Sequence, residues 1–230
     1  KGFININIDK KPYNWQPHTY STYYHSIFNL SRQNIKYVFE CGLGTNNPNL
    51  KSNMSENGIP GASLRVWRDY FFNAKIYGGD IDKSVLFEED RIKTFYVDQL
   101  DTNSIKSMWK NIEVEKFDII IDDGLHEPEA NYNFFINSFH KLKKNGVFII
   151  EDIANIYLEH LQNKLENNIK KELSLDGFNL KISNLLINKT RRLGLQILFD
   201  ERIIKEEREI NYRGVRESRS KSESDIDLYS

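Results

Sequence analysis

The sequence has few of the features that would assign a protein to a class at once. Its single cysteine, Cys41, excludes an internal disulfide, so we expect a reducing, cytoplasmic environment. No apolar run approaches the roughly 20 residues that span a bilayer, and the printed sequence opens with no signal-peptide pattern. The formal net charge is -1, so no overall field would draw the chain to nucleic acid. We therefore expect neither a membrane span nor a nucleic-acid partner.

A glycine-rich segment lacks one residue of a common nucleotide-binding motif. Gly42 and Gly44 follow an expected strand at residues 37–39, and glycines there let a ligand approach the backbone closely. The third glycine of the dinucleotide motif G-x-G-x-x-G is missing, because Asn47 occupies its place. This disfavours a nicotinamide-dependent dehydrogenase. Glu40, two residues before Gly42, is instead typical of methyltransferases that bind a nucleoside-containing cofactor.

The middle of the chain has the pattern of a strand, a helix and a second strand. Two short β-branched or aromatic runs, at 119–121 and 147–150, predict buried strands. Between them, apolar residues recur at helical spacing over 128–143, and Asn145-Gly146 is predicted to end this helix. Such a crossover is nearly always right-handed and joins parallel strands, so both strands end at the same edge of the sheet.

Each of these two strands ends in a pair of acids, Asp122-Asp123 and Glu151-Asp152, and His126 follows the first pair. Neighbouring strands lie roughly 5 Å apart, so the four carboxylates would crowd one volume if the strands are neighbours. Like charges that close repel unless a cation neutralises them, and oxygen ligands suit a hard divalent cation such as Mg, Mn or Ca. The alternative is that one acid of each pair caps a helix while the other faces water.

The remaining periodic segments complete an α/β pattern. Further strands are expected at 74–78, 93–97, 180–187 and 195–199, and helices at 19–30, 61–72, 103–109 and 156–173. Alternation of this kind predicts a doubly wound, Rossmann-like, seven-stranded and mostly parallel sheet, with an antiparallel edge strand because the last two strands are close together. The aromatic helix at 19–30 is expected to pack on this sheet.

Three parts of the chain are expected to have different roles. Residues 1–36 are a lead-in that contains the aromatic helix, 37–204 form the catalytic domain, and 205–230 are a polar, charged tail. The tail has few apolar residues and is expected either to be mobile or to dock on another subunit. We therefore expect an oligomer of identical chains.

Acids at the ends of the second and third strands predict a nucleoside site. Asp80 follows the glycine pair at the distance where an acid commonly holds ribose hydroxyls, although it could instead cap the following segment. Asp98 and Gln99 end the third strand at the height of an adenine amino group. The loop at 46–61 is rich in Asn, Ser, Pro and Gly, and is long enough to cover a ligand.

Taken in order, these motifs resemble the macrocin and mycinamicin type of sugar O-methyltransferase over residues 37–153. They are Glu40-x-Gly-x-Gly, Gly61-x-Ser-Leu-Arg-x-Trp, Ile76-Tyr-Gly-x-Asp80, Asp98-Gln99, Ile120-Ile-Asp-Asp-Gly-x-His126 and Ile149-Ile-Glu-Asp152. The lead-in motif His18-x-Tyr20-x-x-x-Tyr24 is similar to the opening of the family. One departure is Leu125, where the family usually has serine.

The resemblance implies a class I methyltransferase that uses S-adenosylmethionine and a divalent metal, Mg or Mn. It implies that Asp123, Glu151 and Asp152 bind the metal, and that His126 is the general base beside Asp123. It also implies a cofactor site made of Glu40, Gly42, Gly44, Ser63, Arg65, Asp80, Asp98, Gln99 and Asp122, with Ser63 and Arg65 near the methionine end.

The implied acceptor is a sugar hydroxyl, expected on a nucleotide sugar or a surface glycan precursor and used for polysaccharide biosynthesis. A hydroxyl is a poor nucleophile, and a divalent cation with a nearby histidine base is a chemical solution to that problem. Two alternatives stay open at this point. The acceptor could be another small molecule, a catechol or an amine, or the chain could be a cofactor-binding module without catalysis.

Overall fold

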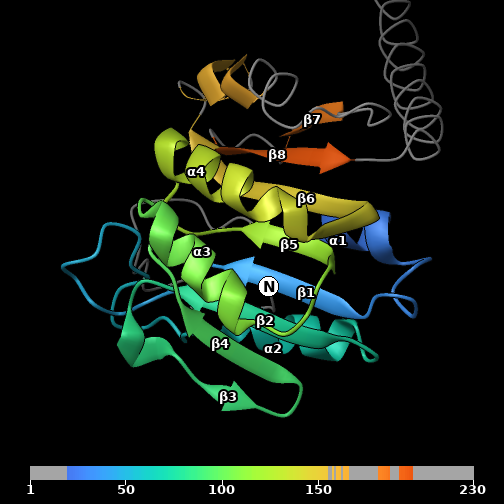
Figure 1. Cartoon of the computed structure of the whole chain (residues 1–230), viewed down its shortest axis with the longest axis horizontal. Coiled ribbons are helices and arrows are strands. Elements are labelled where there is room, and N and C mark those ends of the chain that lie inside the picture. Colours follow the sequence, from blue (N-terminus) through green and yellow to red (C-terminus); the bar gives the residue numbers. More distant parts are fainter. Residues whose placement is uncertain are drawn as a thin grey trace, which may run out of the picture.

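One β-sheet forms the centre of the protein (Figure 1). The computed structural model describes residues 20–154, 157, 159–161, 163–165, 181–186 and 192–198. Within these residues the sheet has eight strands, in the order β3-β4-β2-β1-β5-β6-β8-β7. The strands are β1 (Tyr37–Cys41), β2 (Lys75–Asp80), β3 (Glu88–Glu89), β4 (Ile92–Tyr96), β5 (Phe117–Asp122), β6 (Leu142–Ala154), β7 (Lys181–Leu186) and β8 (Arg192–Leu198). The helices with full bounds are α1 (Ser21–Phe28), α2 (Ala62–Tyr70), α3 (Thr102–Asn111) and α4 (Pro128–Ser138).

Helices cover both faces of the sheet, with α3 and α4 on one face and α2 on the other (Figure 1). Under α3 and α4, Phe39 and Phe148 of the sheet pack with Trp109 and Phe134 in one buried cluster. On the opposite face, α1 and α2 contribute to a second buried cluster around Trp67. Because the central strands are buried on both faces, they are nearly continuous apolar runs, and this made them recognisable in the sequence.

The predicted fold class is confirmed. β4, β2, β1, β5 and β6 pair in parallel, so their carboxyl ends share one edge of the sheet. Antiparallel pairing occurs at the two ends, where β8 lies antiparallel between β6 and β7, and β3 lies antiparallel to β4. The two-residue strand β3 was not predicted, because two residues are too few to show a period.

The predicted end of the helix after β5 is wrong. Helix α4 ends at Ser138, a short 3₁₀ turn covers Phe139–Lys141, and Asn145-Gly146 lies inside β6. Leu142 is buried and pairs with Phe117, so burial and sheet pairing outweigh the helical spacing at this point. Asn145 has a positive φ of 66°, and the register between β5 and β6 shifts nearby, between Phe117 and Ile119.

Several predictions fall outside the described residues. The structure does not describe residues 1–19 and 199–230. The division of the chain into lead-in, domain and tail therefore stays a prediction. The helix predicted at 156–173 is described at 157, 159–161 and 163–165, and those residues are helical. In the described part of the chain, no helix is long and apolar enough to cross a membrane.

Candidate active site

Side chains alternate between the two faces of a strand, and this alternation separates the paired acids at the carboxyl edge. Asp122 is in register with Cys41 and Ile150, which both belong to the buried cluster under α3 and α4. The next residue, Asp123, lies instead with His126 and Asp152. The first acidic pair therefore supplies one buried structural carboxylate and one carboxylate to the candidate site.

Asp122 is fully buried, and its carboxylate accepts hydrogen bonds from the side chains of Gln99, at 2.6 Å, and Asn131, at 2.9 Å. Burial raises the pKa of Asp122, and these two donors oppose that rise. Gln99 also accepts the backbone N–H of Leu125 at 2.8 Å, so it ties the loop after β4 to the loop after β5. The structure thus joins two predicted cofactor residues, Asp122 and Gln99, to each other in a buried network.

Asp123, His126 and Asp152 form the group that could hold a metal ion. Each offers one ligand atom, and these atoms all lie within 4.8 Å of one another. His126 and Asp152 have positive φ angles of 61° and 54°, which cost about 1–3 kcal/mol each for residues other than glycine. Such strain is typically retained where function requires a particular side-chain direction.

The donor set fits a divalent cation. Two carboxylates supply hard oxygen ligands, which Mg and Mn prefer. The Nδ1 atom of His126 is buried and has no hydrogen-bond partner in the structure. A buried nitrogen without a partner costs about 1–3 kcal/mol, so its presence indicates that a bound group completes the site.

Glu151, the third predicted metal ligand, is not part of this group of three residues. Its side chain is fully buried and accepts a short hydrogen bond from the hydroxyl of Tyr24. The structure therefore brings together two of the three predicted carboxylate ligands with the predicted base. A ligand role for Glu151 stays a prediction that rests on the resemblance.

Two tyrosines contact the second acidic pair: Tyr20, which immediately precedes α1, and Tyr24, which lies within it. The hydroxyl of Tyr20 donates to Oδ1 of Asp152 at 2.7 Å and accepts the backbone N–H of Asp152 at 3.0 Å. Tyr24, one helical turn later, donates to Glu151. Burial, followed by the negative charges of nearby acids, raises the pKa of both tyrosines far above its usual range, so both hydroxyls remain donors. The sequence predicted packing for this aromatic helix but not these hydrogen bonds.

Gly42 brings the glycine loop directly against the candidate metal site. It has a φ of 93°, and a Cβ added to it would lie 2.1 Å from the carbonyl oxygen of Asp123. Its N–H donates to the carbonyl of Gly79 at 2.8 Å, while the N–H of Asp123 donates to the carbonyl of Cys41 at 2.9 Å. Backbone hydrogen bonds and the close contact at Gly42 therefore hold the glycine loop and Asp123 against each other.

Glu40 is buried between β1 and α2. Ser63 and Trp67, one turn apart on α2, both donate short hydrogen bonds to its carboxylate. The structure thus brings Glu40 and Ser63 together, as expected for two residues of one cofactor site. Trp67 was not predicted, although its spacing of four residues from Ser63 places both side chains on one helical face.

The acids that end β2 and β4 each accept backbone hydrogen bonds. The oxygens of Asp80 accept the N–H groups of Leu43 and Asp82, both at 2.8 Å, and burial raises the pKa of Asp80. Asp98 accepts the N–H of Leu100 at 2.9 Å and forms a tight turn. Asp80 therefore fixes the glycine loop. Its carboxylate interacts with the backbone of Leu43, Ile81 and Asp82, and a carboxylate accepts about four hydrogen bonds.

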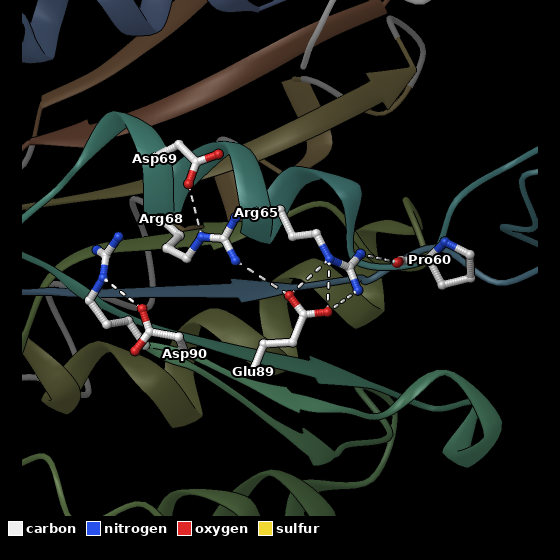
Figure 2. Close-up of polar contacts among 7 residues, drawn as sticks. Pro60, Arg65, Arg68, Asp69, Glu89 and Asp90 are labelled. Atoms are coloured by element: carbon white, nitrogen blue, oxygen red, sulfur yellow. Dashed lines mark hydrogen bonds and ion pairs between the residues drawn. The ribbon is translucent and has the colours of Figure 1, made fainter.

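The guanidinium of Arg65 is directed toward Glu89 and Pro60, as Figure 2 shows. Its guanidinium forms an ion pair with Glu89 at 2.6 Å and donates to the carbonyl of Pro60 at 2.9 Å. The guanidinium carbon also lies 4.5 Å from the ring centre of Phe87. Residues two apart on a helix do not share a face, so Arg65 points away from Glu40 while Ser63 contacts it. Arg65 lines a cavity of about 580 Å³, to which Thr45 and Asp82 also contribute.

Comparisons with known proteins find relatives of this chain among methyltransferases. No protein-family model matches the chain. Demethylmacrocin O-methyltransferase of Streptomyces fradiae is 31% identical over 140 residues, which cover 61% of this chain and 33% of that protein. A tetracenomycin-C rhamnosyl 2'-O-methyltransferase of Streptomyces olivaceus is 29% identical over 156 residues, which cover 68% of this chain and 39% of the relative. Over these residues, this chain is similar to the macrocin- and mycinamicin-type sugar O-methyltransferases.

A solved structure extends the comparison to three dimensions. The MycE methyltransferase of the mycinamycin pathway, solved in complex with Mg and SAH, is 26% identical and superposes with a TM-score of 0.54. The alignment covers 79% of this chain and 50% of the MycE chain. The resemblance predicted from the motifs is thus confirmed. The chain spans between a third and two fifths of the length of the two curated relatives described above.

Proposed function

We propose that the protein transfers a methyl group from S-adenosylmethionine to a sugar hydroxyl, with a divalent cation bound at the carboxyl edge of the sheet. The observation that carries this proposal is the group of Asp123, His126 and Asp152, with a buried imidazole nitrogen that has no partner. Support comes from homologues named as O-methyltransferases of glycosylated compounds, and from a related structure solved with Mg and SAH.

We assign a separate role in the reaction to each residue of the site. Asp123 and Asp152 hold the cation, and Glu151 is the predicted third ligand. A divalent cation held there stabilises negative charge that develops on a hydroxyl oxygen. His126 takes the hydroxyl proton at Nδ1, the nitrogen that has no partner in the structure. His126 has a positive φ of 61°, and a ring nitrogen of its imidazole lies within 4.8 Å of both carboxylates.

The cofactor residues lie around the glycine loop. Gly42 and Gly44 have left-handed conformations, and the space that a Cβ would need is filled by the Asp123 backbone at Gly42 and by the Met54 side chain at Gly44. Asp80 holds the ribose while it anchors the loop at Leu43, and Glu40 with Ser63 marks the methionine end. The cofactor would supply the methyl group, and the protein would supply binding and orientation. The polar contacts of Asp122, Gln99 and Arg65 lie within the protein, as do those of Glu40 and Ser63, and a cofactor role for each stays a prediction.

The acceptor is the least constrained part of the proposal. The names of two homologues point to glycosylated macrolides and tetracenomycins as acceptors of those proteins. A nucleotide sugar or a surface glycan precursor offers the same vicinal hydroxyls, so both remain candidates for this chain. A catechol also chelates a metal through adjacent oxygens and belongs in the same comparison.

Methyl transfer measured with labelled S-adenosylmethionine tests the proposal. The panel contains a glycosylated polyketide, nucleotide sugars, a glycan precursor and a catechol, each with Mg or Mn and each with a chelator. We expect transfer to a sugar-bearing acceptor only when metal is present, while SAH binds with similar affinity in both conditions. Full activity in metal-free protein would contradict the metal role. Binding of a nicotinamide dinucleotide in place of SAH would contradict the cofactor assignment.

A further inference from the structure

Asp152, one of the two carboxylates of the candidate metal site, lies where the regular pairing of β6 with β8 is interrupted. β6 pairs with β8 up to Ile150 and again from Ile153, and the register shifts between these two residues. Asp152 itself has a positive φ of 54°. Bulges of this kind redirect a side chain and are common beside active sites. The direction of the Asp152 carboxylate therefore depends on whatever stabilises this bulge.

Tyr20 contacts both the backbone and the side chain of Asp152 through one oxygen atom. Its hydroxyl accepts the backbone N–H of Asp152 at 3.0 Å and donates to Oδ1 of the same residue at 2.7 Å. The tyrosine is 1% exposed and lies beside the ring of Tyr24, with the ring centres 6.2 Å apart. A fixed ring thus holds both the amide and the carboxylate of the bulged residue.

We propose that Tyr20 is a positioning residue of the cation site. It acts through Asp152: by holding the bulge, it keeps the carboxylate beside Asp123 and His126. Without the hydroxyl, the strained backbone of Asp152 loses the partner of its N–H, and the carboxylate gains freedom to turn away. This inference rests on the proposed function, since it assigns Tyr20 to the same metal site.

The test compares wild-type protein with Tyr20→Phe and the control Tyr70→Phe. The hydroxyl of Tyr70 contacts Nδ1 of His25 at 3.2 Å, so the control also loses one tyrosine hydroxyl but touches none of the site acids. Mn²⁺ affinity and SAH affinity are both measured by calorimetry, and melting temperature is recorded for each protein. We expect Tyr20→Phe to weaken Mn²⁺ binding by tenfold or more while SAH affinity stays within about threefold of wild type. Tyr70→Phe should leave both affinities unchanged.

Each outcome is decisive. Wild-type Mn²⁺ affinity in Tyr20→Phe overturns the positioning role and leaves the proposed function intact. Equal losses of Mn²⁺ and SAH affinity also overturn it, because they indicate general loosening of α1. If wild-type protein binds no Mn²⁺, the proposed metal dependence fails first, and this inference falls with it.

Discussion

Replacing Gly42 with alanine should damage the glycine loop and the candidate metal site together. The new Cβ would lie 2.1 Å from the carbonyl oxygen of Asp123 and 2.6 Å from its carbonyl carbon. These are backbone atoms, so no side-chain rotation relieves the contact. The φ of 93° is also unfavourable for any residue with a Cβ. The Asp123 segment must therefore move, or β1 must separate from it.

The magnitude follows from these two contributions. A left-handed conformation costs roughly 1–2 kcal/mol in a residue with a Cβ, and forcing extra volume into a packed site costs about 1–3 kcal/mol. We expect Gly42→Ala to lower the free energy of unfolding by about 2–5 kcal/mol. This is a large fraction of the roughly 5–15 kcal/mol that a typical domain has. Mn²⁺ affinity should fall as well, because Asp123 is the residue that is displaced.

Denaturant unfolding and Mn²⁺ titration measure the two effects, with Gly78→Ala as the control. A Cβ at Gly78 would also be crowded, but at 2.6 Å from the tips of the Leu43 and Leu64 side chains, which can turn away. The control should lose less stability and keep its Mn²⁺ affinity. The reasoning is refuted if Gly42→Ala unfolds within about 1 kcal/mol of wild type and binds Mn²⁺ equally well.

Two further predictions concern the cofactor and the base. Asp80→Ala should weaken SAH binding by about 1.5–3 kcal/mol, the scale of a hydrogen bond to a charged group, and calorimetry on a folded variant that shows unchanged affinity would remove Asp80 from the ribose site. His126→Ala should bind cofactor normally and lose roughly 10²–10⁴-fold in kcat, as expected for a general base. A parallel Mn²⁺ titration separates the roles of His126, because affinity lost in step with rate would make it a ligand instead.

The sequence predicted the sheet well because the deciding signals are local. Strands β1 and β5 and residues 147–150 of β6 are short apolar runs, and the right-handed crossover rule then predicts that they are parallel. The same rule places Asp122, Asp123, Glu151 and Asp152 at one edge of the sheet from the sequence alone. The end of α4 could not be predicted in the same way, because the pairing of Leu142 with Phe117 is a long-range contact.

The different roles of these acids could not be predicted from the sequence either. Asp122 and Asp123 are adjacent and chemically identical, and they differ only in the partners that the fold brings to them. Asn131 and Gln99, which bond Asp122, lie 9 and 23 residues away in the chain. Tyr20, which holds Asp152, lies 132 residues away. Contacts at such separations leave no periodic or spacing signal in the sequence.

A Mn²⁺ titration of Asp123→Asn and Asp122→Asn tests the central claim most directly, namely that this edge of the sheet holds a divalent cation and uses specific acids to do so. Asp123→Asn should lose at least tenfold in Mn²⁺ affinity and retain most of its stability. Asp122→Asn should keep Mn²⁺ affinity within a few-fold but lose about 1–3 kcal/mol of stability, because its new amide group would face the donors of Gln99 and Asn131. The claim is contradicted if Asp123→Asn binds Mn²⁺ as wild type does, or if wild-type protein does not bind Mn²⁺ at all.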